Sequence, residues 1–92
     1  MRDKRKVLER FSRVLDLPAD IMAGLPRISI IGLSEILIEN HRGILLYNDT
    51  DIHVNGGAAV IKLHGDKLSV AAANPGEILI TGRLIGIDFV YI

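Results

Sequence analysis

From residue 27 onward the chain consists of short runs rich in isoleucine and valine, separated every several residues by glycine, asparagine or aspartate. This spacing is typical of successive β-strands joined by tight turns. We predict about eight strands, at residues 27–31, 34–39, 43–47, 51–54, 58–64, 67–71, 77–81 and 83–91. Turns are predicted at residues 40–43, 48–50, 55–57, 65–66 and 74–76. Asparagine and glycine accept positive φ there, and Pro75-Gly76 suits a type II turn.

A pattern of two apolar residues and a glycine at alternate positions recurs in this part of the chain, starting at Ile28, Ile52, Ile61 and Ile78. The intervals between the repeats are unequal, whereas a β-solenoid requires a constant period. The chain is therefore predicted to be mostly β, with an antiparallel meander folded into a sandwich or an open barrel. A β-solenoid is the alternative.

The predicted strands differ in how their apolar residues are placed. In the last strand Ile85, Ile87, Phe89 and Tyr91 alternate with other residues, so we expect one face of it to join the core. Residues 36–38, 44–47 and 78–80 are apolar on both faces. Their second face must be covered by another sheet layer, by a helix or by a partner.

The N-terminal segment has a different period. Val7, Leu8, Phe11, Val14 and Leu15 follow the spacing of an amphipathic helix over residues 3–15, and Pro18 ends it. Residues 18–24 read as a further helical turn. We therefore divide the chain into a basic N-terminal helix and helical turn at residues 1–26 and a β domain at residues 27–92, which form a single folding unit.

Composition limits the functional classes that remain. The chain has 92 residues, no cysteine and zero net charge, yet residues 1–13 hold six basic residues against two acidic ones. This basic segment is expected to face the acidic remainder of the chain or an anionic surface such as a membrane. With no disulfides, no export signal and no apolar run of membrane-spanning length, we expect a cytoplasmic protein.

No catalytic, cofactor-binding or metal-binding pattern is found. His41, His53 and His64 lack the spacing of metal ligands, and the aspartates at 49, 51 and 66 lie in or beside turns. The chain has four aromatic residues and an acidic β half, which argues against nucleic-acid binding. We expect no enzymatic activity, no cofactor and no small-molecule substrate.

Several segments carry a family resemblance. They are ENHRGILLY at residues 39–47, IKLHGDKLSV at 61–70, EILITG at 77–82 and IDF at 87–89. In their order and spacing, and with the basic segment in front, they resemble the YabP/YqfC family of small sporulation proteins, and its YqfC branch most of all. Gly65, Leu68, Glu77 and Gly82 match the family pattern, and the glycines are read first as turn requirements.

The resemblance implies a non-enzymatic protein of the mother cell that acts with a membrane-anchored sporulation protein at the forespore surface. The implied location is the mother-cell cytoplasm, with peripheral contact at the outer forespore membrane. A self-assembling β structural subunit is the alternative function, so a homo-oligomer stays open. The candidate interaction residues are Arg5, Lys6, Arg10, Arg13, Asn40, His41, Arg42, Leu45 and Tyr47.

Removing residues 1–16 tests the use of the apolar stripe. We expect a folded β domain of lower thermal stability and solubility, because each stripe residue that covers a sheet face contributes about 1.5 to 3 kcal/mol before the entropy of ordering is subtracted. Thermal denaturation of the full and shortened chains measures the loss. Equal melting temperatures would mean that the stripe faces a partner or a membrane, and vesicle binding would then be measured.

Overall fold

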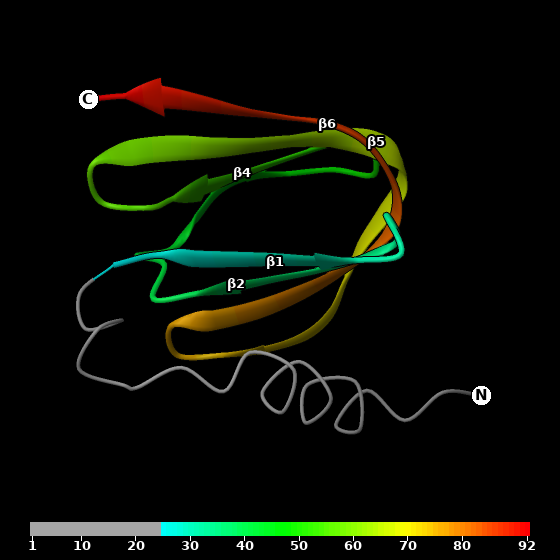
Figure 1. Cartoon of the computed structure of the whole chain (residues 1–92), viewed down its shortest axis with the longest axis horizontal. Helices are drawn as coiled ribbons and strands as arrows, with labels where there is room; N and C mark the ends of the chain where they lie inside the picture. Colours follow the sequence, from blue (N-terminus) through cyan, green and yellow to red (C-terminus); the bar gives the residue numbers. More distant parts are fainter. Residues whose placement is uncertain (1–24) are drawn as a thin grey trace.

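The computed structural model describes residues 25–92, so the predicted helix and helical turn lie outside the described residues. These residues form one antiparallel six-stranded sheet (Figure 1). The strands are β1 (Arg27–Ile31), β2 (Glu35–Glu39), β3 (Ile44–Tyr47), β4 (Asp51–Asn55), β5 (Ala59–Asn74) and β6 (Glu77–Tyr91). Their order across the sheet is β1-β2-β6-β5-β4-β3.

The predicted number of strands was too high, because two long strands each replace two short ones. β5 spans 16 residues and β6 spans 15, and they pair from Ala59 and Tyr91 at one end to Asn74 and Glu77 at the other. The turn predicted at residues 65–66 and the break at Gly82 are bends inside these strands. The predicted turn at Pro75-Gly76 is confirmed, and Gly76 has the positive φ of 84° that it requires.

The bend has a local cause in the register of the β5–β6 pair. The register shifts between His64 and Gly65 and again between Asp66 and Ser69, which marks β-bulges. Bulges increase twist and bend the strand without ending the pairing. At the same bend, Lys67 and Gly82 take φ values of 53° and 134°. Gly65 has no side chain to hold the backbones of β5 and β6 apart.

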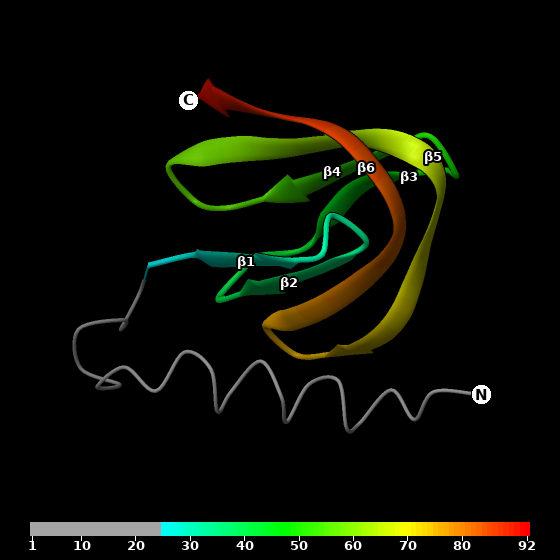
Figure 2. The same cartoon turned by 45° about the vertical axis from the view of Figure 1, so that its right-hand side comes forward.

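Because both long strands bend, the sheet folds over on itself into two facing layers (Figure 2). The first layer contains β1, β2, the start of β6 and the end of β5. The second contains β3, β4, the start of β5 and the end of β6. The expected antiparallel pairing is confirmed, and no described pair of strands is parallel, as a solenoid would require.

The connectivity departs from the predicted continuous meander. Strands β3 to β6 form a meander, but β2 pairs with β6 rather than with β3. Residues 40–43 therefore cross from the first layer to the second. We call residues 40–43 the crossing loop. Because of it, the ENHRGILLY segment at residues 39–47 begins in the first layer and ends in the second.

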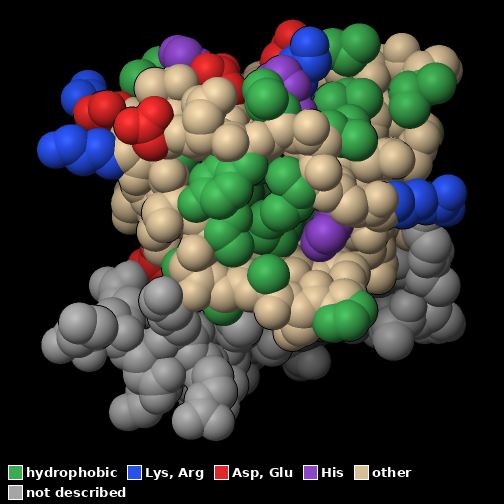
Figure 3. All heavy atoms as spheres, turned by 180° about the vertical axis from the view of Figure 1, so that it is seen from behind, with side chains coloured by type: hydrophobic (Ala, Val, Ile, Leu, Met, Phe, Trp, Pro, Cys, Tyr) green, Lys and Arg blue, Asp and Glu red, His purple; other side chains and the backbone are tan. Residues whose placement is uncertain are grey.

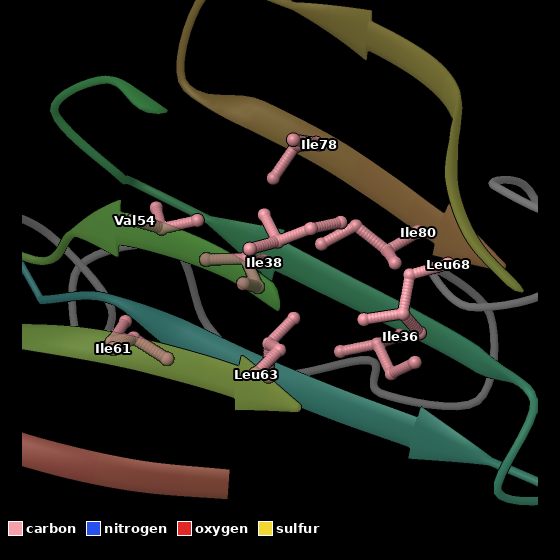
Figure 4. Close-up of a cluster of buried hydrophobic side chains, with 9 residues drawn as sticks. Ile36, Ile38, Val54, Ile61, Leu63, Leu68, Ile78 and Ile80 are labelled. Carbon is pink, nitrogen blue, oxygen red and sulfur yellow. The ribbon is translucent and has the colours of Figure 1, made fainter. Parts of the chain in front are cut away.

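The core lies between the two layers. Its buried side chains come from both, and they point toward one another (Figure 4). They are Ile36, Ile38, Ile52, Val54, Ile61, Leu63, Leu68, Ile78 and Ile80. Leu68 stands at the bend itself. The core exists only because the sheet is folded, since β2 and β4 belong to opposite layers.

A second buried cluster lies on the other face of the first layer. Leu37 and Leu79 are cross-strand partners, and they are 2% and 1% exposed. Ile31, Ala71 and Ala72 pack against them. The prediction that residues 36–38 and 78–80 are covered on both faces is thus confirmed.

A methyl group added at Gly65 should destabilise the bend. An added Cβ at Gly65 would overlap the backbone oxygen of Arg83, and a shift of that backbone would disturb the β5–β6 pairing. We expect Gly65→Ala to lower the free energy of unfolding by about 1 to 3 kcal/mol, the usual effect of overpacking. Gly86→Ala is the matched control, because nothing lies within 4 Å of its added Cβ. Urea denaturation measures both, and equal losses would contradict the proposed cause of the bend.

Candidate interaction surface

The crossing loop is hydrogen-bonded to both layers of the sheet. The amide of His41 donates to the carbonyl of Gly76, at the β5–β6 turn of the first layer, over 3.3 Å. The amide of Arg42 donates to the carbonyl of Asn55 over 2.7 Å, and the Asn55 amide donates back to Gly43 over 2.8 Å. Asn55 ends β4 in the second layer. The loop therefore joins the layers at the end of the fold opposite the bend.

Two residues of the crossing loop need unusual backbone angles. Asn40 has φ of 62°, which asparagine tolerates, and its side-chain amide donates to the carbonyl of Leu25 over 2.9 Å. Gly43 has φ of 115°, in a region that is open mainly to glycine. These two positions therefore have a structural reason for their residue types, apart from any contact with a partner.

His41 is fixed by its own loop. The amide of Gly43 donates to His41 Nδ1 over 3.0 Å, so Nδ1 carries no proton and the ring hydrogen of the neutral imidazole sits on Nε2. Nε2 is buried and has no hydrogen-bond partner. Arg42, by contrast, is exposed, and its side chain lies over Gly57 of the neighbouring turn. Of this pair, Arg42 is the residue whose side chain is exposed to a partner.

β3 continues from the loop as an exposed apolar strand at one edge of the sheet. Ile44, Leu45, Leu46 and Tyr47 are 42%, 57%, 43% and 51% exposed. The register with β4 shifts between Ile44 and Leu46, so Leu45 stands at an irregularity of the ladder. Figure 3 shows one face of the molecule with a central patch of hydrophobic side chains, with charged side chains toward its margins. The apolar run predicted at residues 44–47 thus forms surface in the described structure.

Tyr47 bridges the two layers on this side. Its hydroxyl oxygen accepts a hydrogen bond from the amide of Val70 over 3.1 Å, in the part of β5 that forms an edge of the first layer. The ring stays half exposed while its polar end is satisfied. A tyrosine held in this way offers a rigid apolar face, which is a common property of residues in protein interfaces.

The other two histidines lie on the second layer, apart from the crossing loop. His53 is paired with Lys62, and His64 is the cross-strand partner of Asp51. His64 Nδ1 lies 3.0 Å from Asp51 Oδ1. This hydrogen bond, followed by one from Thr50, holds the pKa of the exposed Asp51 carboxyl below its usual value. The pair forms a surface contact between β4 and β5.

Within residues 25–92 no three histidine, cysteine, aspartate or glutamate side chains come together in a way that could hold a metal ion. The same part of the chain contains no helix long and apolar enough to cross a membrane. Of the predicted candidate residues, Asn40, His41, Arg42, Leu45 and Tyr47 are adjacent in the fold. Arg5, Lys6, Arg10 and Arg13 lie outside the described residues.

The end of β6 was misread from the sequence. The alternation of Ile85, Ile87, Phe89 and Tyr91 predicts one core-facing side, and Ile87 does pack against the core. Phe89 and Tyr91 are 45% and 79% exposed, and Ile85 is exposed as well. The reason is that β6 is the outermost strand of the second layer here. Phe89, the cross-strand partner of the buried Ile61, therefore lies at the rim of the core with one side open to solvent.

Comparison with known proteins gives one informative match. The chain is 32% identical over 87 residues to a protein of Bacillus subtilis (strain 168) described as "Uncharacterized protein YqfC". The alignment covers 95% of this chain and 94% of that protein. The chain belongs to the YqfC family. No protein-family model and no solved structure matches it. At most five residues of this chain lie outside the alignment, so the crossing loop and β3 fall within the part shared with the other YqfC-family protein.

Lysine substitutions separate surface from core among three leucines. We expect Leu45→Lys to stay folded, with a change of about 0.5 kcal/mol or less in the free energy of unfolding, because its side chain is mostly in solvent. Leu37→Lys and Leu79→Lys should lose at least the roughly 2 to 5 kcal/mol that truncating a buried leucine costs. Circular dichroism with urea denaturation measures all three. A collapsed Leu45→Lys variant would show that β3 is part of the core.

Proposed function

We propose that the chain is a non-enzymatic sporulation protein that acts as an interaction module. Its partner is a membrane-anchored protein at the surface of the developing forespore, and the chain works from the mother-cell side. Membership of the YqfC family supports this role, because the resemblance to the broader YabP/YqfC grouping implies a part in endospore formation. The basic residues of the N-terminal segment would favour an anionic membrane nearby.

The observation that carries the proposal is the exposed strand β3. Four consecutive apolar residues stand on the surface at an edge of the sheet. Contiguous apolar surface on a small protein usually marks a binding site, and interfaces commonly combine apolar centres, tyrosine and arginine. β3 provides the apolar centre and Tyr47, and the adjacent crossing loop provides Arg42.

A self-assembling structural subunit is the second candidate. The sheet is open, so both of its outermost strands have one edge without a strand partner among the described residues. Edges of this kind can pair with another chain. If different edges of the same molecule were joined head to tail, growth would be open-ended, and a filament or a layer would result.

Localisation and cross-linking in the sporulating organism that encodes the chain test the module. We expect a fluorescent fusion to appear in the mother cell and gather around the forespore. Leu45→Lys should disperse it, because a charge in the apolar strand opposes docking. A photo-cross-linking residue at position 45 should capture a protein of the membrane fraction, and the same residue at the exposed position 33, in the turn between β1 and β2, should not.

Leu33→Lys is the control for the substitution, since it replaces an exposed leucine by the same charge beside β1, at the other end of the strand order from β3. The proposal fails if the wild-type fusion is diffuse throughout sporulation, or if positions 45 and 33 cross-link to the same proteins. Filaments or sheets that require Leu45 would favour the structural subunit instead.

A further inference from the structure

The described sheet has four free strand edges, two in each layer, and three of them carry features that hinder pairing with another chain. β1 is short, with five residues. β3 has four residues and an irregular register at Leu45. The end of β5 contains a register shift between Val70 and Ala72, and Tyr47 already occupies the amide of Val70. Short strands, bulges and occupied amides are common ways of protecting sheet edges.

The fourth edge, formed by residues 86–91 of β6, is the least protected of the four, although the Phe89 amide there is bonded to the adjacent Asp88 side chain. Its register with β5 is regular from the Gly86–His64 pair to the Tyr91–Ala59 pair. It contains no proline and a single charged residue, Asp88. Phe89, Val90 and Tyr91 are exposed although they are large and apolar. An exposed, regular and apolar edge is a favourable site for the addition of a strand.

Two hydrogen bonds identify which backbone groups face this edge. The amide of Ile92 donates to the carbonyl of Ala58, on the β5 side of the strand. Because backbone direction alternates along a strand, Ile87, Phe89 and Tyr91 direct their amides and carbonyls away from β5. The hydrogen bond of the Phe89 amide is consistent with this direction, since the amide donates to Oδ1 of the neighbouring Asp88 over 3.0 Å rather than to β5.

We propose that this edge binds the same edge of a second copy of the chain, in a two-fold antiparallel pair centred on Phe89. The symmetry places Phe89 beside its own copy and Ile87 beside Tyr91, so every outward-facing residue gains a backbone partner. Asp88 then lies opposite Val90 of the other copy. A pair centred one residue earlier would place the two Asp88 side chains opposite each other, which like charges disfavour.

Such a dimer is closed, because each copy uses the least protected edge of its described sheet and the two-fold pairing occupies that edge on both copies. It would extend the second layer into one continuous sheet across both copies. β3 lies at the opposite side of that layer and stays free, so the dimer does not compete with a partner bound at β3. The pairing also has to release the Phe89 amide from Asp88, which makes Asp88 a local competitor of the dimer.

Substitutions at Val90 test the register as well as the dimer. Val90 is exposed, so charged residues are tolerated there in the folded monomer. Val90→Asp would face Asp88 of the second copy and repel it, whereas Val90→Lys would attract it. We expect a wild-type dimer in sedimentation equilibrium, and a dimer dissociation constant at least tenfold higher for Val90→Asp than for Val90→Lys. The difference should shrink in 1 M salt, because the charges are screened.

Charge exchange provides the decisive control. Adding Asp88→Lys to Val90→Asp restores opposite charges in both symmetric pairs and should restore the dimer. Leu45→Lys, on β3, should leave the dimer dissociation constant unchanged. This result would distinguish the dimer interface from the partner-binding surface proposed at β3. The inference is overturned if the full chain is monomeric up to millimolar concentration, if the two Val90 variants dissociate alike, or if growth continues beyond two copies.

Discussion

The close approach of Gly65 in β5 to the backbone of Arg83 in β6 is the contact on which the fold depends. It lets one hairpin bend while its pairing continues, so the same two strands serve both layers. Without the bend, β2 and β4 would lie in one flat sheet, and their isoleucines would have no facing surface to bury. Nine buried residues drawn from both layers make up the main core, so its hydrophobic stabilisation follows from this local geometry.

The opposite end of the fold is joined by polar contacts. There the crossing loop exchanges backbone hydrogen bonds with Asn55 and donates one to Gly76. Nearer the bend, the Tyr47 hydroxyl accepts a hydrogen bond from the Val70 amide. The exposed strand β3 is therefore anchored at both of its ends, by the loop before it and by Tyr47 at its last position. A strand fixed in this way loses less conformational entropy when a partner binds than a free loop would. The same residues thus support the fold and the surface.

The sequence predicts the strands well where turn chemistry is explicit. Pro75-Gly76 and the asparagine-containing loops lie where they were expected, and residues 36–38 and 78–80 are covered on both faces. Gly65 and Gly82 were misleading, because a glycine that permits close approach of two backbones looks the same in sequence as one that ends a strand. Phe89 and Tyr91 could not be placed either, since alternation identifies a common face but not whether another layer covers it.

Of the candidate site, the sequence identified the adjacent residues Asn40 to Tyr47 but not their separate tasks. His41 Nδ1 is occupied by the Gly43 amide, and Asn40 and Gly43 have backbone requirements of their own, which leaves Arg42 and β3 for recognition. These distinctions arise from the path of the loop between layers. That path depends on β2 pairing with β6, a contact between distant segments that no local pattern records.

The connectivity also sets an order of folding. The β5–β6 hairpin closes through a two-residue turn, and contacts of this kind form within microseconds. Pairing of Ile36 with Ile80 closes a much longer loop and has a larger entropic cost. β1 and β2 can therefore join only after β6 provides a template. During synthesis β2 is made before β6, so the edge of β2 that pairs with β6 stays without that partner until β6 has been made.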